Sequence, residues 1–255
     1  MKELSSKTGS VEKALQLIEC FTIEEPTLTL DELSERTGFS KPTAFRMACS
    51  LEKFGYLRRA DKKGQMGFQL GMAFLEKGEM VNRQIDIRDM ARKQMLQLRN
   101  DTGLSVQLAV KDGQDAVYVE QFESLKHIRV FPQVGRRVPL YVAACPRVLL
   151  AALTEEEQKW IVEKNEVEPF AATLKLDRNQ LLKELSKIAK QGYAISRGEL
   201  YKGTVAIAVP IRNINGNVLA ALSVIGVEQD FTDGRMDFYI RTLKETVRKI
   251  EQELS

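Results

Sequence analysis

One stretch, residues 29–56, limits what this chain can fold into more than any other. It reads TLDELSERTGFSKPTAFRMACSLEKFGY and predicts two short helices separated by a tight turn. Thr29 followed by Glu32 fits a capping box at the start of the first helix. Gly38 fits the sharp turn at its end, because a residue without Cβ adopts positive φ at low cost. Ser40 then suits the N-cap of the second helix.

The second helix of this pair has two unlike faces. Its apolar residues recur at helical spacing and should face inward: Ala44, Met47, Ala48 and Leu51. The outward positions are mostly polar or basic and begin at the helix N-terminus: Lys41, Thr43, Phe45, Arg46, Ser50 and Lys53. Such a helix fits the DNA major groove. A plain helical hairpin with a solvated, charged face explains this pattern equally well.

Charge is distributed unevenly around this stretch. Residues 36–63 carry eight basic side chains against two acidic ones, whereas residues 1–35 carry three basic against eight acidic. The whole chain has a formal net charge of only +3, so its total charge says little about a polyanionic partner. A local positive patch is what phosphate neutralisation requires, although most charge runs are merely solvated surface.

The flanking segments predict a winged helix-turn-helix. A helix from Ser10 should precede the pair, and two short strands, residues 56–59 and 66–70, should follow it. The turn between these strands carries Lys62 and Lys63. At the tip of a wing these lysines would contact backbone phosphate or the minor groove, which positions the protein, while the helix face reads sequence.

The rest of the chain changes its pattern twice. Residues 71–102 predict a long helical tract with a candidate interruption near residues 83–86. Its apolar faces are wide, so it either packs against a second copy or is buried within one subunit. From residue 103, strands, helices and strands again predict an α+β domain with an antiparallel sheet and helices on its faces. The predicted strands are SVQLAVKDG, DAVYVEQF, residues 127–131, GYAIS, TVAIAVPIR and VLAALSVIGV, and the predicted helices are residues 145–153, a segment from Thr154, residues 177–190 and residues 233–254.

Six motifs, three in each half of the chain, occur in a consistent order and spacing. They are SVEKALQLIECF, LTLDELSERTGFSKPTAFRMACSLEKFGYL, FQLG, VGRRVPL, GYAISRGELYKGTVAIAVPI and GNVLAALSVIG. Together they resemble the IclR family of bacterial transcriptional regulators over almost the whole chain. The resemblance implies a mixed α/β protein: a winged helix-turn-helix at residues 1–70, a linker helix used in dimerisation at 71–86 and a GAF-like effector domain at 87–255.

The same resemblance implies partners and site residues. The partners are a palindromic double-stranded DNA operator, a second copy of the chain in a dimer or dimer of dimers, and a small organic effector such as an organic or sugar acid. On the recognition helix and the wing, the DNA-binding residues are Lys41, Pro42, Thr43, Phe45, Arg46, Arg58, Lys62 and Lys63. The effector-binding residues are His127, Val138, Ala144, Cys145, Ser196, Thr204, Ala206, Ser223 and Ile225.

The chain departs from the family pattern in the effector segment. After the PL pair it reads YVAACPR, where many relatives have a small, polar Ala-Gly-Lys stretch. Ala206 stands where a cysteine is common, and Ser196 where an acidic residue often occurs. The pocket therefore need not accept the small organic acids sensed by relatives.

An enzyme is the alternative from another functional class. A Cys145–His127 dyad would need close geometry between distant segments and an oxyanion hole. No dinucleotide-binding, P-loop or metal-ligand motif occurs in the sequence, so we expect no cofactor and no metal. Arg136, Arg137 and Arg147 could pair with a ligand carboxylate, or could simply be solvated. We expect a ligand-responsive repressor rather than an enzyme; a regulator whose C-terminal domain is purely structural stays open.

The cysteines and the hydropathy pattern bear on where in the cell the protein is found. The three cysteines are far apart and fit no disulfide framework. No basic-then-apolar leader opens the sequence, and no apolar run approaches about 18 residues. We therefore expect a cytoplasmic protein without a membrane partner.

Overall fold

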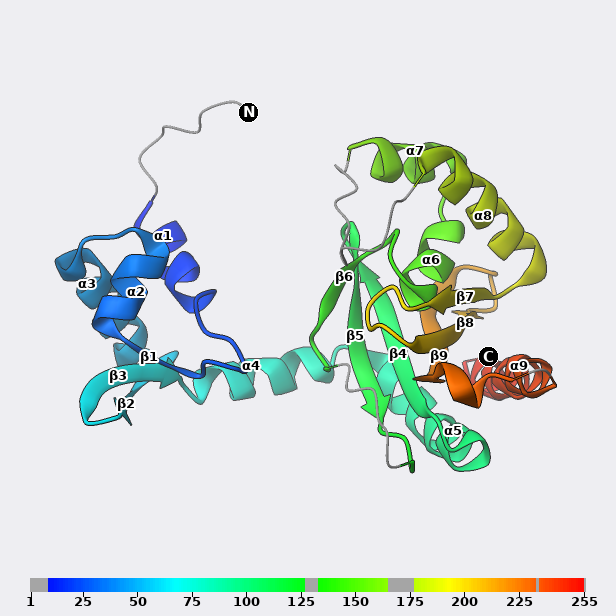
Figure 1. Cartoon of the computed structure of the whole chain (residues 1–255), viewed down its shortest axis with the longest axis horizontal. Coiled ribbons are helices and arrows are strands. Elements are labelled where there is room, and N and C mark those ends of the chain that lie inside the picture. The colour runs from blue at the N-terminus through cyan, green and yellow to red at the C-terminus, as the bar shows by residue number, and fades with distance from the viewer. Residues whose placement is uncertain (1–8, 127–132, 165–176, 233, 255) are drawn as a thin grey trace. The chain divides into compact units, whose positions relative to one another are not determined.

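The computed structural model describes residues 9–126, 133–164, 177–232 and 234–254 (Figure 1). The chain forms two compact units, Met1–Gln84 and Ile85–Ser255, and each has its own hydrophobic core. Within the described residues, none of the helices combines the length and the apolar character that crossing a membrane requires.

The N-terminal unit packs helices against a small antiparallel sheet. Its elements are α1 (Ser10–Ile18), β1 (Thr27–Thr29), α2 (Leu30–Thr37), α3 (Lys41–Lys53), β2 (Leu57–Lys62), β3 (Gln65–Leu70) and α4 (Ala73–Asn82). The strand order is β1-β3-β2. The core between the helices and the sheet consists of Leu17, Leu28, Leu33, Ala44, Ala48, Leu57 and Phe68. This arrangement is the winged helix-turn-helix that the sequence predicts.

Local signals in the sequence explain the helix pair. The Thr29 hydroxyl accepts from the Glu32 backbone N–H at 3.3 Å, and a Glu32 carboxylate oxygen accepts from the Thr29 N–H at 2.7 Å, which completes the capping box. Gly38 ends α2 with a φ of 70°. Ala44 and Ala48 are fully buried, so the apolar stripe of α3 faces the core as predicted.

The wing differs from its prediction in length and in strand number. Strands β2 and β3 pair as far as Lys62 and Gln65, so the turn shrinks to Lys63 and Gly64, both with positive φ. The third strand, β1, was not predicted. It forms because Leu28 is fully buried opposite Phe68 of β3. A pairing between residues this far apart in the chain cannot be predicted from a three-residue segment.

Gly71 allows α4 to begin directly against the backbone that follows α3. Its N–H donates to the Tyr56 carbonyl at 2.8 Å, and the Ala73 N–H donates to the Gly55 carbonyl at 3.2 Å. A Cβ on Gly71 would lie 2.0 Å from the Gly55 carbonyl oxygen, so no side chain fits there. Backbone contacts therefore fix the first turn of α4.

The C-terminal unit is a six-stranded antiparallel sheet with helices on both faces. Its elements are α5 (Asp86–Thr102), β4 (Ser105–Asp112), β5 (Asp115–Phe122), β6 (Arg137–Pro139), α6 (Ala144–Ala151), α7 (Glu155–Lys164), α8 (Arg178–Gln191), β7 (Ala194–Arg197), β8 (Thr204–Arg212), β9 (Val218–Val227), the short 3-10 helix η1 (Glu228–Asp230) and α9 (Arg235–Glu253). The strand order is β6-β5-β4-β9-β8-β7. Helices α6 and α8 pack on one face and α5 and α9 on the other (Figure 1).

The predicted elements of this unit that fall on described residues are found, and one further strand, β6, was not predicted. The helical tract breaks at Arg83–Ile85, close to the predicted interruption, and Asn215-Gly216 forms the β8–β9 turn, with Gly216 at a φ of 80°. The short strand β6 was expected to be loop. The predicted strand at residues 127–131 lies outside the described residues.

Candidate nucleic-acid interface and ligand cavity

Helix α3 presents the predicted polar face to solvent. Lys41, Pro42, Phe45 and Arg46 are exposed, and Thr43 is half-buried. Among the described residues, Arg46 makes no ion pair, so its guanidinium is available to a partner. Phe45 leaves 39% of its surface exposed, so its ring is accessible to a partner of α3.

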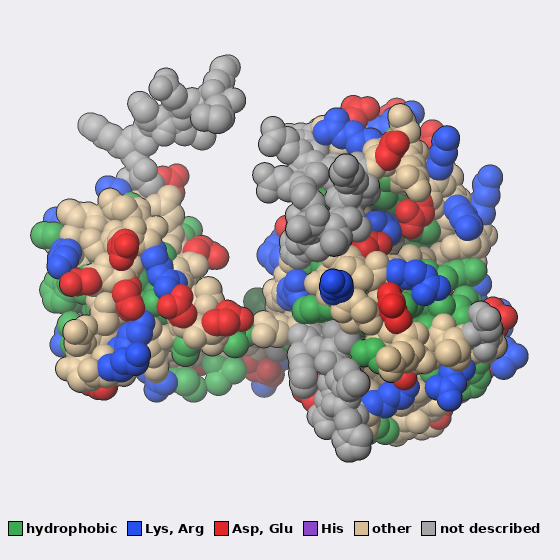
Figure 2. All heavy atoms as spheres, viewed as in Figure 1, with side chains coloured by type: hydrophobic (Ala, Val, Ile, Leu, Met, Phe, Trp, Pro, Cys, Tyr) green, Lys and Arg blue, Asp and Glu red, His purple; other side chains and the backbone are tan. Residues whose placement is uncertain are grey.

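Several basic residues of the predicted positive patch are already paired with carboxylates. The pairs are Arg36–Glu25, Lys41–Asp31, Arg59–Glu52 and Lys62–Glu32. The face of the N-terminal unit that is turned to the viewer in Figure 2 accordingly shows acidic and basic side chains side by side. Among the described residues, the basic side chains predicted to bind DNA that make no ion pair are Arg46, Arg58 and Lys63. Arg58 donates to the Gln69 amide oxygen at 2.8 Å. Fewer basic side chains are therefore free to contact phosphate than the sequence indicates.

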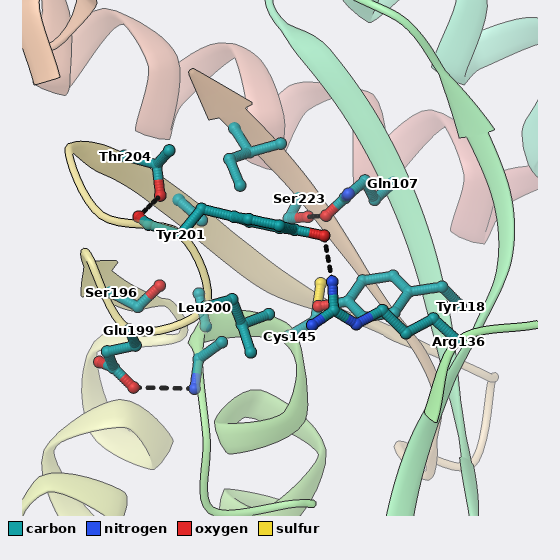
Figure 3. Close-up of a pocket in the computed structure, with 14 residues that line it drawn as sticks. Gln107, Tyr118, Arg136, Cys145, Ser196, Glu199, Leu200, Tyr201, Thr204 and Ser223 are labelled. Carbon is teal, nitrogen blue, oxygen red and sulfur yellow. Dashed lines mark hydrogen bonds between the residues drawn. The ribbon is translucent and has the colours of Figure 1, made fainter. Parts of the chain in front are cut away.

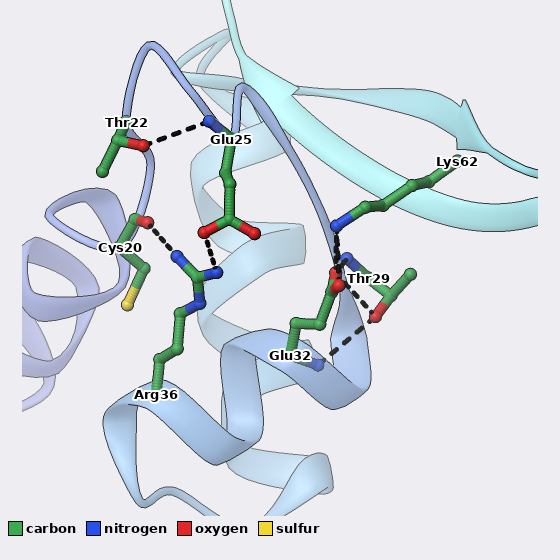
Figure 4. A network of polar contacts seen from close by, with 7 residues as sticks. All are labelled: Cys20, Thr22, Glu25, Thr29, Glu32, Arg36 and Lys62. Carbon is green, nitrogen blue, oxygen red and sulfur yellow. Dashed lines mark hydrogen bonds and ion pairs between the residues drawn. The ribbon is translucent and has the colours of Figure 1, made fainter.

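Glu32 connects the wing to the start of α2 (Figure 4). The Lys62 ammonium lies 2.6 and 2.7 Å from the two Glu32 carboxylate oxygens. These hydrogen bonds, together with the one from the Thr29 N–H, lower the pKa of Glu32 to about 2. Lys62 is the last residue of β2, and only Lys63 occupies the predicted position on the wing tip. A phosphate contact from Lys62 would have to replace its pairing with Glu32.

A narrow cavity lies in the C-terminal unit between the sheet and the start of α6 (Figure 3). Its volume of about 20 Å³ is room for roughly one water molecule. Its lining consists of Gln107, Tyr118, Arg136, Ala143, Ala144, Cys145, Ser196, Glu199, Leu200, Tyr201, Thr204, Ala206, Ser223 and Ile225. Seven of the predicted effector-binding residues thus meet at one place. Of the other two, Val138 is fully buried in the adjacent core, and His127 lies outside the described residues.

Several polar side chains that line the cavity were not assigned to it from the sequence. They include Gln107 on β4, Tyr118 on β5, and Glu199 and Tyr201 in the β7–β8 loop. The available signal was weak: Gln107 lies between the apolar residues Val106 and Leu108, and Glu199 and Tyr201 lie within a few residues of the predicted Ser196. Their convergence depends on which strands are neighbours, and the sequence pattern alone does not supply that order.

Arg136 and Tyr201 fill much of the cavity together. The Arg136 guanidinium donates to the Tyr201 hydroxyl and lies 5.0 Å from the centre of its ring, so it makes both a hydrogen bond and a cation–π contact. The Thr204 hydroxyl donates to the Tyr201 carbonyl at 2.6 Å. In Figure 3 the Tyr201 ring lies across the middle of the lining residues. Arg137, in contrast, pairs with Asp112 at the surface, 2.7 Å away.

Arg147 is buried beneath the cavity and has its own partners. Its guanidinium donates to Glu199 at 2.8 Å, to Glu184 at 3.1 Å and to the Tyr141 carbonyl at 3.0 Å. The second Glu199 oxygen accepts from the Ala143 N–H at 2.9 Å. Burial raises the pKa of Glu199 despite the neighbouring arginine. These contacts tie the β7–β8 loop to the start of α6, so Arg147 is a structural cation and Arg136 is the arginine that lines the cavity.

Cys145 does not have the chemistry of a nucleophile. Burial raises its pKa to about 12, although the neighbouring Ser223 side chain opposes the change. A reactive cysteine needs the opposite, a lowered pKa that yields thiolate near neutral pH. The thiol lies 3.7 Å from the Ala221 carbonyl and packs at the start of α6.

Two family models match this chain. The model described as "Bacterial transcriptional regulator IclR C-terminal" covers residues 80–252, and the "IclR helix-turn-helix domain" covers residues 10–61. The chain belongs to the IclR family. The HTH-type transcriptional regulator KipR of Bacillus subtilis is 35% identical over 98% of this chain and 99% of its own.

Two further relatives of this IclR-family protein have informative descriptions. The HTH-type transcriptional repressor AllR of Escherichia coli is 25% identical over 96% of this chain and 90% of its own. An IclR homolog from Microbacterium hydrocarbonoxydans, solved in complex with 4-hydroxybenzoate, shares the fold with a TM-score of 0.80 at 24% identity, covering 96% of this chain and 99% of its own. The protein is thus a helix-turn-helix transcriptional regulator, and not an enzyme, whose family binds DNA with one domain and small molecules with the other.

Proposed function

We propose that this protein is a repressor that binds a palindromic operator as a dimer and changes its operator affinity when a small organic acid occupies the cavity of the C-terminal unit. The observation that carries the proposal is the exposed face of α3, where Arg46 has no ion pair among the described residues. The repressor sense is supported by AllR, a family member described as a repressor.

The geometry of α3 suits base recognition in a major groove. In helix-turn-helix proteins the N-terminal residues of the second helix contact base edges. Thr43 and Arg46 lie in the first two turns of α3, and an arginine side chain can donate two hydrogen bonds to the O6 and N7 atoms of guanine. Arg58 and Lys63 on the wing would contact phosphate, which fixes the register of the helix on the duplex.

An apolar groove on the N-terminal unit supports a dimer. The groove has a volume of about 580 Å³ and is lined by α1 residues, the end of α3 and Phe74 of α4. Leu15 and Phe54 at the groove are 55% and 69% exposed, and Leu75 on α4 is 66% exposed. Because groove and apolar helix occur on the same unit, two copies can each offer α4 to the other in a symmetric contact. We therefore propose a second copy of α4 as its occupant.

The cavity supports an organic acid as effector. Arg136 supplies the guanidinium for a carboxylate, and Tyr118 and Tyr201 supply aromatic walls. The relative that was solved with 4-hydroxybenzoate has the same fold. Because the cavity has room for about one water, a ligand must move Tyr201 or its neighbours in order to enter. That movement can shift the population between DNA-binding and non-binding arrangements.

Mobility shifts with DNA from upstream of the protein's own gene test the proposal. The native protein should bind one sequence selectively at physiological salt, and Arg46→Ala should weaken this binding about tenfold or more and flatten discrimination between sequences. Lys53→Ala is the matched control, because Lys53 is exposed at the opposite end of α3. It should lower affinity for all sequences alike. Unchanged selectivity in Arg46→Ala would show that α3 does not read the operator with this face.

A further inference from the structure

A row of polar residues crosses the sheet at one side of the cavity. Gln107 of β4 pairs in register with Ser223 of β9 on one side and with Gln121 of β5 on the other. Gln107 is only 3% exposed, although it is the polar residue on the central strand that lines the cavity. Figure 3 shows its amide beside Ser223 and near the end of the Tyr201 ring.

The amide of Gln107 is only half satisfied. Its Oε1 accepts from the Ser223 hydroxyl at 3.5 Å, which is a long hydrogen bond. Its Nε2 is buried and has no hydrogen-bond partner among the described residues. Buried polar groups in folded proteins almost always have partners, and an unmet donor costs free energy comparable with a lost hydrogen bond. The Oε1 of Gln121, the register neighbour of Gln107 on β5, is also buried without a partner among the described residues, so a contact between the two amides is one way to satisfy Nε2. The other is an oxygen acceptor inside the cavity, which Gln107 lines and Gln121 does not.

The size of the cavity restricts which occupant satisfies this donor. With room for about one water, the empty state can satisfy Nε2 by a single water molecule. A ligand that enters displaces that water. It then either offers an oxygen acceptor of its own or leaves the amide unpaired in a buried site, and the second outcome loses affinity.

We propose that Gln107 selects the effector by donating its amide N–H to an oxygen acceptor of the ligand. The selected compounds are carboxylic acids with a second oxygen, a hydroxyl or carbonyl, in addition to the carboxylate that Arg136 receives. The inference rests on the proposed effector site and adds the residue that discriminates within it. A site built to hydrogen-bond a polar group rejects the analogue that lacks it far more strongly than a hydrophobic site rejects a missing methyl group.

Pairs of ligands that differ by one hydroxyl test the selection. We suggest 4-hydroxybenzoate with 4-methylbenzoate, and lactate with isobutyrate, because each pair exchanges a hydroxyl for a methyl group of similar size. Ligand binding raises the melting temperature by mass action. In at least one pair the hydroxy acid should stabilise the full-length native protein at a concentration about tenfold lower than its partner, and Gln107→Met should remove this difference.

The ligand-free protein gives an independent readout. Gln107→Met removes an amide whose Nε2 has no protein partner among the described residues and displaces at most one water, so the melting temperature without ligand should be unchanged or higher. Gln191→Met is the matched control, because Gln191 is half-buried in the same unit and donates to the Tyr193 carbonyl at 2.6 Å. That substitution removes a made hydrogen bond and should lower the melting temperature.

The outcomes separate this inference from the function on which it rests. If the native protein binds acids but binds the two members equally in every pair, Gln107 does not select and the effector site stands. If Gln107→Met lowers the ligand-free melting temperature as much as Gln191→Met, Gln107 has a structural role and the inference is overturned. If no acid changes the melting temperature of the native protein, the proposed effector site itself loses its support.

Discussion

Arg136 and Tyr201 compete with any ligand for the same space. The guanidinium that would receive a carboxylate already donates to the Tyr201 hydroxyl, and its charge lies against the ring of the same residue. An incoming acid must therefore replace a contact that exists in the empty protein. The affinity of the site depends on the strength of this internal pair as well as on the contacts that the ligand makes.

Removing the Tyr201 hydroxyl should make the cavity easier to occupy. In Tyr201→Phe the ring stays, but Arg136 loses this acceptor, so carboxylates should bind more tightly, by up to about tenfold. Calorimetric titration with the acid that stabilises the native protein measures the change. Tyr193→Phe serves as control, because Tyr193 contacts Lys244 away from the cavity. Weaker binding in Tyr201→Phe would mean that the hydroxyl contacts the ligand instead of opposing it.

The role of each arginine in the site was the feature hardest to predict from the sequence. Arg136, Arg137 and Arg147 are equivalent in sequence as candidate partners of a carboxylate. They differ because Arg147 is buried against Glu199, a residue 52 positions away, whereas Arg137 reaches Asp112 on the surface. Only the folded chain brings these partners together, so the sequence predicted that a pocket forms near Cys145 but not which charge faces it.

At the scale of elements, Glu32 has two roles: it caps the start of α2, and it forms an ion pair with Lys62 of the wing. Its pKa is lowered from 4.5 to about 2, chiefly by the hydrogen bond from Lys62. A carboxyl group whose folded pKa is lowered adds stability at pH values above its unfolded pKa, and this contribution is lost as the pH falls toward the folded value. The N-terminal unit should therefore lose stability between about pH 4.5 and 2.

Glu32→Gln separates the two roles. Glutamine can still cap α2 but no longer forms an ion pair with Lys62, so the variant should lack that part of the acid-induced loss of stability, measured by denaturant unfolding at several pH values. It should also free Lys62 for phosphate and steepen the salt dependence of operator binding by about one unit of slope. Glu79→Gln is the control: it frees Arg83 directly after α4, outside the helix pair and the wing. An unchanged slope in Glu32→Gln would place Lys62 away from the DNA.

Elements were predictable from sequence where local chemistry defines them. The capping boxes, the glycine at the end of α2 and the Asn215-Gly216 turn all act within a few residues, and the helices and hairpins they bound are where the pattern indicates. The strands β1 and β6 were missed because three residues show no alternation. They are strands only because β3 and β5 lie beside them.

At the scale of the whole molecule, the apolar groove predicts how copies associate. Replacing Phe54, 69% exposed at the groove, by Asp should leave the fold intact and shift the protein from dimer to monomer in analytical ultracentrifugation. Because a palindrome is bound by two linked half-site contacts, operator affinity should fall by at least about a hundredfold. Ile214→Asp is the control, since Ile214 is 76% exposed on the β8–β9 turn. Dissociation by Ile214→Asp, with Phe54→Asp still dimeric, would assign the interface to the C-terminal unit.

The close backbone approach at Gly71 has a consequence for how such regulators diverge. At the start of α4 the Gly71 N–H donates to the Tyr56 carbonyl and the Ala73 N–H donates to the Gly55 carbonyl, and the rings of Tyr56 and Phe74 pack edge to face with their centres 5.1 Å apart. These contacts set the direction in which α4 leaves the wing, and the outer face of the helix is not part of them. Substitutions along the outer face of α4 can therefore change which other chain this protein dimerises with. The direction in which the helix leaves the wing stays the same. Partner choice and DNA reading can evolve separately, provided that position 71 stays glycine.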